Sequence, residues 1–240
     1  GPEGRGDGAT APRPAAVDRR PLLSRIKVYA AVDPPQDPTS RWAATIGATM
    51  RVFDAAATEA ALPFPDLIAA LRERFAAGCE VPPRHVHEIV NPLGEAGQDA
   101  AGRRMTSLIM PAWIPGRYYG VKIVNIAPGN ARRQLPGLHA TYLLFDARSG
   151  VPLAQLDGDV ITARRTAAAS ALAGSYLARP EAKHLLVVGA GRVARLLPAA
   201  WRAVRPIEQV TVWARRETEA QALAAQWQAQ GWSARATTDL

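Results

Sequence analysis

Hydrophobic positions repeat with a helical period in one early stretch of the chain and with a strand period in several stretches after it. Apolar side chains at 67, 68, 71 and 75 form one stripe, which predicts a helix over residues 66–77. Alternating or β-rich stretches predict strands, the last two of which form a hairpin. These strands cover residues 84–87, 107–110, 119–126, 141–146 and 151–156. We therefore expect an α+β unit here.

A short helix precedes this unit and a long helix follows it. The helical pattern starts at Asp54, with Thr58 as the expected cap and the proline-containing segment 62–65 as the break. An alanine-rich run predicts a helix over residues 160–178, which Pro180 ends.

Strand and helix patterns alternate through the rest of the chain. Pro198 should kink the first of these helices or mark its limit. Three strands and two helices make the first half of a doubly wound α/β sheet, so we expect a Rossmann-type dinucleotide-binding domain truncated at its C-terminus. The strands are predicted at 185–188, 209–213 and 232–237, and the helices run from Gly191 to about 204 and over 217–230.

Three regions follow from these patterns. Residues 1–49 are rich in Gly, Pro, Arg and Ala and have no hydrophobic period, and the first methionine is Met50. Our hypothesis is that Met50 is the natural start and that 1–49 is a non-native or disordered extension. Residues 50–180 are expected to form an α+β substrate-binding and dimerisation domain, and residues 181–240 the first half of the NAD(P)-binding domain.

Composition narrows the class of protein. Cys79 is the only cysteine, which excludes an internal disulfide and a thiolate metal cluster and fits a reducing cytoplasm; we expect it to be a small core residue. No run is long and apolar enough to cross a bilayer. The net charge is +8, but the arginines are scattered, so we expect an anionic cofactor and substrate rather than nucleic acid. Asp157 and Asp159 are interpreted as turn and helix-start residues, and no metal site is expected.

A glycine-rich turn after the strand at 185–188 is the main candidate for cofactor binding. Gly189 allows a tight turn, Gly191 lets the backbone approach a pyrophosphate, and Ala194 takes the third, helix-packing position. The alternative is an ordinary strand-to-helix turn. At the end of the next strand stand Arg215 and Arg216 instead of an acidic residue, which favours NADP(H), with NAD(H) possible. Alternatively, these two arginines are a solvated pair.

Three cations before this turn are candidates for holding an anionic amine or imine. Lys122 lies inside an otherwise apolar strand, Arg84 follows two prolines, and Arg165 begins the long helix. Arg164 and Arg165 point about 100° apart, so only one readily faces a cleft. Together such cations would clamp a carboxylate, although each alone could be a solvated charge. The glycine-rich loop 125–139 could close over a ligand, and His139 could contact it.

These residues together resemble the ornithine cyclodeaminase/μ-crystallin family. The resemblance rests on the segments 120–125, 128–130, 135–137, 157–158, 162–168 and 189–191, and it covers residues 50–240. It implies a substrate and dimerisation domain joined to a Rossmann domain, and a likeness to homodimers. It implies that Arg84, Lys122 and Arg165 hold the substrate. It also implies that Thr166 and the turn residues contact the cofactor, the latter being Gly189, Gly191, Arg192 and Val193.

The resemblance leaves several functions open. The first is an NAD(P)H-dependent reductase of cyclic imino acids such as Δ1-pyrroline-2-carboxylate, giving L-proline, with Lys122 orienting or protonating the imine nitrogen. The second is ornithine cyclodeaminase, which releases ammonia and recycles NAD+. The third is an NADPH-dependent small-ligand binder. In deaminating members a catalytic Asp lies later in the Rossmann domain, beyond residue 240, so the 240 residues alone could also be inactive.

Overall fold

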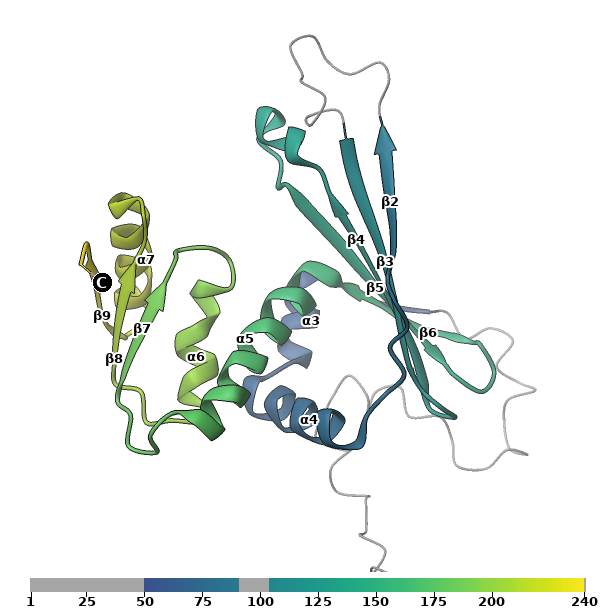
Figure 1. The fold of residues 1–240 in the computed structure, drawn as a ribbon, viewed down its shortest axis with the longest axis horizontal. Helices are drawn as coiled ribbons and strands as arrows, with labels where there is room; N and C mark the ends of the chain where they lie inside the picture. The colour runs from purple at the N-terminus through teal and green to yellow at the C-terminus, as the bar shows by residue number, and fades with distance from the viewer. Residues whose placement is uncertain (1–49, 91–103, 240) are drawn as a thin grey trace, which may run out of the picture.

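The computed structural model describes residues 50–90 and 104–239. The predictions for residues 1–49 lie outside this part of the chain. The described residues form two β-sheets, with helices between them (Figure 1). The predicted division near residue 180 falls between the helix that ends at Leu177 and the strand that begins at His184.

The larger sheet has six strands in the order β1-β6-β5-β4-β3-β2. β1 pairs with β6 in parallel, and every other pair is antiparallel. The strands are β1 (Arg51–Phe53), β2 (His85–Val90), β3 (Arg104–Ile114), β4 (Tyr118–Ile126), β5 (Leu138–Asp146) and β6 (Pro152–Asp157). A 3-10 helix, η2 (Pro128–Arg133), interrupts the loop between β4 and β5. The predicted hairpin is confirmed as β5 and β6.

β3 continues past residue 110, where the sequence predicts its end. It does so because Pro111 faces an edge of the strand at which no backbone N–H donor is needed. Trp113 exchanges two backbone hydrogen bonds with Glu80 at the outer edge of the strand. Pro111, two residues earlier, turns its nitrogen to the same edge, beyond the last β2–β3 pair at His85 and Ile109. A residue without an N–H group is tolerated there, so the strand continues through Pro111.

α3 (Ala55–Ala61) and α5 (Gly158–Leu177) pack on one face of the larger sheet, and α4 (Phe64–Ala77) packs against α5 on the same side (Figure 1). The expectation that Thr58 caps the first helix is wrong. Asp54 is the N-cap, and its side chain accepts a 2.8 Å hydrogen bond from the backbone N–H of Ala57. Thr58 is fully buried, and its hydroxyl donates to Phe53 O and accepts from Asp157 N, which ties α3 to β1 and β6.

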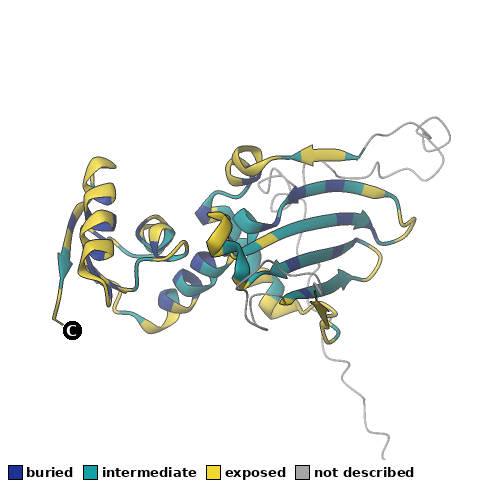
Figure 2. Cartoon of the chain, turned by 90° about the horizontal axis from the view of Figure 1, so that it is seen from above, coloured by how far each residue is buried: buried dark blue, intermediate teal, exposed yellow. Residues whose placement is uncertain are grey.

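The smaller sheet is parallel in the order β7-β8-β9, as the βα pattern predicts. Its strands are β7 (His184–Val188), β8 (Gln209–Trp213) and β9 (Ser233–Thr237). α7 (Glu217–Ala229) packs on it with Leu223 and Trp227 buried, and its outer face is exposed (Figure 2). The expected helix after Gly191 is divided into a 3-10 turn, η3 (Ala194–Leu196), and α6 (Leu197–Arg202), with Pro198 in the first turn of α6.

The part of the chain that contains the larger sheet and the part that contains the smaller sheet meet where α5 packs against α6. Gly174 of α5 lies so close to Trp201 that a Cβ there would stand 2.4 Å from the indole ring. The guanidinium of Arg205 donates to Ser175 O and Ala178 O at the end of α5. In the described ranges, 50–90 and 104–239, no helix has the length and apolar character that a bilayer crossing requires.

Candidate functional site

A cavity of about 510 Å³ lies between α4, α5 and the helix-facing side of the larger sheet. Its wall is mostly apolar, and the polar groups are a few side chains from each element. Lys122 comes from β4, Tyr142 from β5 and Arg165 from α5, while Asp66 and Arg74 come from α4. The apolar wall includes Leu62, Leu67, Leu71, Phe75, Val81, Met110, Leu144, Leu156 and Ile161. A concave apolar site with few polar groups is typical of a small-molecule site.

Lys122 stands in the cavity with other positive charges around it. Its Nζ donates a 3.3 Å hydrogen bond to Thr162 Oγ1. Burial lowers the pKa of Lys122, and the charges of Arg165 and then Arg84 lower it further. The structure therefore brings the other two cations predicted from the sequence, Arg165 and Arg84, within electrostatic range of Lys122. A carboxylate entering the cavity would relieve their mutual repulsion.

The two neighbouring arginines of α5 have different surroundings, as their 100° separation predicts. Arg164 is buried: it pairs with Glu59 at 2.7 Å, donates to Leu62 O at 2.9 Å and lies over the ring of Phe64. Burial lowers the pKa of Arg164, and Glu59 opposes that change. Arg165 is exposed and lines the cavity. Arg164 is thus held by contacts within the fold, and Arg165 is the one of the two that faces the cavity.

The glycine-rich turn after β7 has an open backbone, and it leads into the 3-10 turn η3 before α6 begins at Leu197. Gly189 has φ +111°, a conformation that side chains rarely adopt, and its N–H donates to Trp213 O at 2.6 Å. A Cβ added at Gly191 would have no atom within 4 Å, so the backbone there is open to an incoming group. Val193 is half-buried and packs against the core between α4, α5 and α6.

The start of α5 connects this turn to the cavity. Asp159 pairs with Arg192 of the turn at 3.4 Å, while its Oδ1 is buried without a hydrogen-bond partner among the described residues. One turn of helix further on, Thr162 contacts Lys122, and Arg165 follows. Thr166 is half-buried and donates its hydroxyl to Thr162 O. The glycine-rich turn and the cationic cavity are therefore linked through the first turns of α5.

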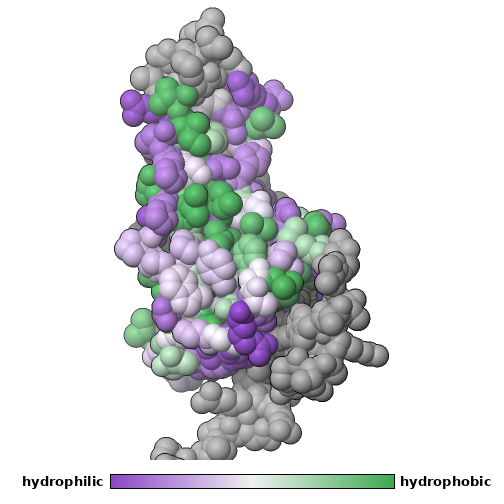
Figure 3. Space-filling view, turned by 90° about the vertical axis from the view of Figure 1, so that its right-hand side faces the viewer, coloured by the Kyte–Doolittle hydropathy of each residue, from purple (hydrophilic) through white to green (hydrophobic). Residues whose placement is uncertain are grey.

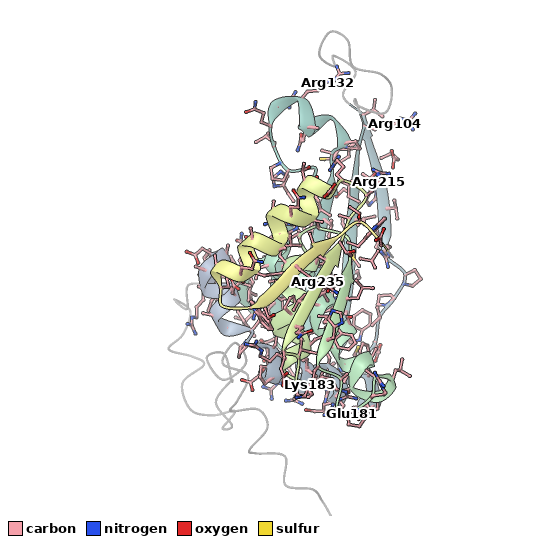
Figure 4. The ribbon with its side chains drawn as sticks, turned by 90° about the vertical axis from the view of Figure 1, so that its left-hand side faces the viewer. Arg104, Arg132, Glu181, Lys183, Arg215 and Arg235 are labelled. Carbon is pink, nitrogen blue, oxygen red and sulfur yellow. The ribbon has the colours of Figure 1, made fainter. Side chains whose placement is uncertain are left out.

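The arginines after β8 lie at the carboxyl end of the parallel strands, where nucleotides bind in sheets of this kind. Figure 4 shows Arg215 at this end and Lys183 at the opposite end of the sheet. Arg216 pairs with Glu219 in the first turn of α7. Arg215 is exposed and has no polar partner within the described residues, so its guanidinium is available to a ligand.

Two residue predictions are wrong. His139 does not face the cavity: it lies three residues from Tyr142 on β5, and because side chains alternate along a strand it points to the opposite face of the sheet, where it is exposed. Cys79 is exposed rather than a core residue, because it follows Gly78, whose φ of +76° turns the chain away at the end of α4.

The aspartates at the start of α5 are turn and cap residues, as interpreted from the sequence. Asp157 is the N-cap and accepts from Val160 N at 2.8 Å, and Asp159 lies in the first turn. No group of three or more His, Cys, Asp or Glu side chains suited to a metal ion occurs in residues 50–90 and 104–239.

Sequence reasoning missed three residues of the site. Thr162 contacts Lys122, Asp159 contacts the turn, and Tyr142 stands opposite Lys122 in the sheet register and lines the cavity. Thr162 and Arg165 lie three positions apart on a helix, which was a usable signal that they share a face. The pairing of Tyr142 with Lys122 follows only from the strand register.

Comparison with known proteins places this site in a family. The sequence profile of the ornithine cyclodeaminase/mu-crystallin family matches residues 94–240. A Δ1-pyrroline-2-carboxylate reductase of Paracoccus denitrificans is 47% identical over 119 residues, which are 49% of this chain and 38% of that protein. The chain spans about half, or less, of the length of the curated relatives it matches.

Two solved structures have the same fold over 78% of this chain. One is the Δ1-pyrroline-2-carboxylate reductase of Thermococcus litoralis in complex with NADH and L-proline, with a TM-score of 0.67, 28% identity and 57% of its chain covered. The other is an archaeal alanine dehydrogenase dimer with bound NAD, with a TM-score of 0.65, 26% identity and 56% of its chain covered. The family profile matches more than half of the chain and the Rossmann-type fold is shared: this chain belongs to the ornithine cyclodeaminase/mu-crystallin family.

Proposed function

We propose that the protein containing this chain reduces cyclic imino acids of the Δ1-pyrroline-2-carboxylate type to the corresponding amino acid, L-proline, with NAD(P)H. The observation that carries the proposal is the cavity in which Lys122 and Arg165 meet, with Arg84 in electrostatic range, one helix turn from a glycine-rich nucleotide turn. The similarity to two reductases of this reaction class supports it.

The chemistry of the two arginines and that of the lysine suit different parts of the substrate. Arg165 and Arg84 suit the carboxylate, because a guanidinium donates two parallel hydrogen bonds to the two oxygens. Lys122 suits the imine nitrogen: its ammonium can hold a proton at that atom while the C=N carbon accepts a hydride. Burial and the two arginines lower the pKa of Lys122, which brings proton release closer to neutral pH.

The residues of the turn fit a dinucleotide. Gly191 leaves open space for a pyrophosphate, and the buried free oxygen of Asp159 can accept a hydrogen bond from an N–H or O–H group of a bound molecule. When bound, the reduced nicotinamide supplies the hydride. The related structures contain NADH or NAD. For this protein we propose a preference for NADP(H), because the exposed Arg215 suits a 2′-phosphate; Arg216, paired with Glu219, would contribute less.

We propose a homodimer that forms through the outer face of the larger sheet. Side chains that alternate with Lys122 and Tyr142 point away from the cavity, and they include Val121, Ile123 and Leu143. Figure 3 shows apolar side chains gathered on this side of the molecule. The related alanine dehydrogenase is described as a dimer. The exposed free thiol of Cys79 fits the reducing cytoplasm in which we propose that the protein works.

The test measures the amounts of nucleotide consumed and of product formed by the full-length protein. Incubation with Δ1-pyrroline-2-carboxylate and NAD(P)H should consume the reduced nucleotide and form proline in equal amounts, without ammonia. Lys122→Ala should abolish turnover and leave nucleotide binding unchanged. Ammonia release from ornithine without net nucleotide consumption would identify a cyclodeaminase instead, and tight ligand binding without turnover would identify a binding protein. Either outcome would overturn the proposal.

A further inference from the structure

We propose that Thr162 is a positioning residue for the reaction. Its hydroxyl oxygen accepts a hydrogen bond from Lys122 and so holds the ammonium group at the substrate nitrogen, while its hydroxyl proton is donated to Gly158 O. This inference rests on the reductase proposed above, and it concerns a residue of the motif 162–168 for which the resemblance implies no role. It follows from the hydrogen bonds at the first turn of α5 and from the packing of Gly158 beneath them.

The hydroxyl of Thr162 has one proton, and the helix uses it. Thr162 Oγ1 donates to Gly158 O at 2.7 Å. Its lone pairs are therefore directed away from that carbonyl, and Lys122 Nζ donates to the same oxygen at 3.3 Å. A hydroxyl fixed as an acceptor defines the direction from which the ammonium approaches, whereas a freely rotating hydroxyl would not.

The carbonyl that fixes Thr162 is itself held against the sheet. A Cβ on Gly158 would stand 2.5 Å from the backbone of Ala140 and 2.6 Å from that of Thr141, so only glycine allows α5 to start this close to β5. β5 is also the neighbour of β4, which carries Lys122. The distance between helix and ammonium is thus set by backbone packing, from β5 through Gly158 to the hydroxyl of Thr162.

The charges around Lys122 explain why its hydrogen-bond acceptor is a neutral hydroxyl and not a carboxylate. Arg165 and Arg84 act on it with the same sign, and Asp66 and Arg74 line the same cavity from α4. No carboxylate within the described ranges forms an ion pair with Lys122. A carboxylate beside it would compete with the substrate's carboxylate for the three cations. A hydroxyl acceptor favours the ammonium form without adding negative charge, so the site keeps its affinity for an anion.

A matched pair of variants tests this role. Thr162→Val has nearly the same shape but no acceptor, and Thr162→Ser keeps the acceptor. In Thr162→Val the pKa of Lys122 should fall further, since a group that stabilised the ammonium is gone. The alkaline loss of kcat/KM should then begin at lower pH, and kcat/KM at neutral pH should drop about tenfold, mainly through kcat. Thr162→Ser should restore both.

The pKa of Lys122 is measured without substrate by the pH dependence of its labelling with acetic anhydride, quantified by mass spectrometry in the full-length protein. Thermal unfolding of both variants should match the wild type within a few degrees. An unchanged labelling profile in Thr162→Val, or a Thr162→Ser variant as impaired as Thr162→Val, would overturn the proposal. Because the labelling needs no turnover, this result is separate from any failure of the proposed reductase activity.

Discussion

Replacing Arg164 by alanine should destabilise the protein, whereas the same replacement of its neighbour Arg165 should not. Arg164 has 8% of its surface exposed, and its guanidinium joins α3, α4 and α5 through Glu59, Leu62 and Phe64. Arg165 is exposed at the cavity and is proposed to hold the substrate. Two adjacent arginines thus separate a structural role from a functional one.

The contacts of Arg164 give the size of the effect. Removing it leaves the half-buried carbonyl of Leu62 without its donor, which costs about 1–3 kcal/mol. The cation–π contact with Phe64 contributes about 0.5–2 kcal/mol. The ion pair with Glu59 contributes below about 1 kcal/mol, because 59% of the Glu59 side chain is exposed. Since neighbouring terms do not add fully, we expect a loss of about 3 kcal/mol.

Urea unfolding followed by circular dichroism measures both variants. Arg165→Ala should stay within about 0.5 kcal/mol of the wild type, as surface substitutions usually do. In calorimetry with L-proline in the presence of the oxidised nucleotide, Arg165→Ala should lose binding, while the folded fraction of Arg164→Ala should keep it. Equal destabilisation by the two substitutions, or intact proline binding by Arg165→Ala, would refute the assignment of the two roles.

Three further predictions concern the turn, the nucleotide and a loop. Gly191→Ala should leave stability unchanged, because a Cβ meets no atom there, but should weaken nucleotide binding by about tenfold or more in calorimetry; unchanged affinity would speak against pyrophosphate binding at this turn. Arg215→Ala should reduce affinity for NADPH about tenfold and leave that for NADH unchanged, and an equal effect on both would remove the 2′-phosphate role. Asp146→Asn should cost about 1 kcal/mol at pH 7, because burial raises the pKa of Asp146 but hydrogen bonds from Ser149 and Arg148 lower it more, giving a net lowering. A lowered pKa gives stability above the unfolded value that disappears as pH falls, so wild type and variant should converge below about pH 4 in acid unfolding; a constant difference would exclude this ionisation.

Periodicity predicted most of the helices and strands, but not β1 or the order of the strands in the larger sheet. The parallel order of β7, β8 and β9 followed from alternating strand and helix patterns, and the hairpin of β5 and β6 followed from its turn. Local sequence was less informative where tertiary contacts decide. β3 passes through Pro111 only because β2 ends before it, and Thr58 is buried by β6, which lies about a hundred residues later in the chain.

The site was predicted only in part, because some of its contacts depend on tertiary structure that the local sequence does not specify. A lysine in an apolar strand and adjacent arginines on a helix are visible in the sequence, and Lys122 and Arg165 indeed line one cavity. Which face of β5 is turned to that cavity depends on pairing register, so the orientation of His139 away from it could not be derived. The contact between Asp159 and Arg192 joins the first turn of α5 to the turn after β7, and the local sequence carries no signal for it.

The central claim is that the cations of the cavity hold an imino acid with its C=N carbon facing a nicotinamide held by the turn at 189–194. Transfer of deuterium from NAD(P)H that carries deuterium at both C4 positions of the nicotinamide tests it directly. The full-length protein, given Δ1-pyrroline-2-carboxylate, should produce L-proline with deuterium at Cα by mass spectrometry and NMR, and Lys122→Ala should not. Proline without the label, or no proline from a protein that binds the nucleotide, would contradict the account.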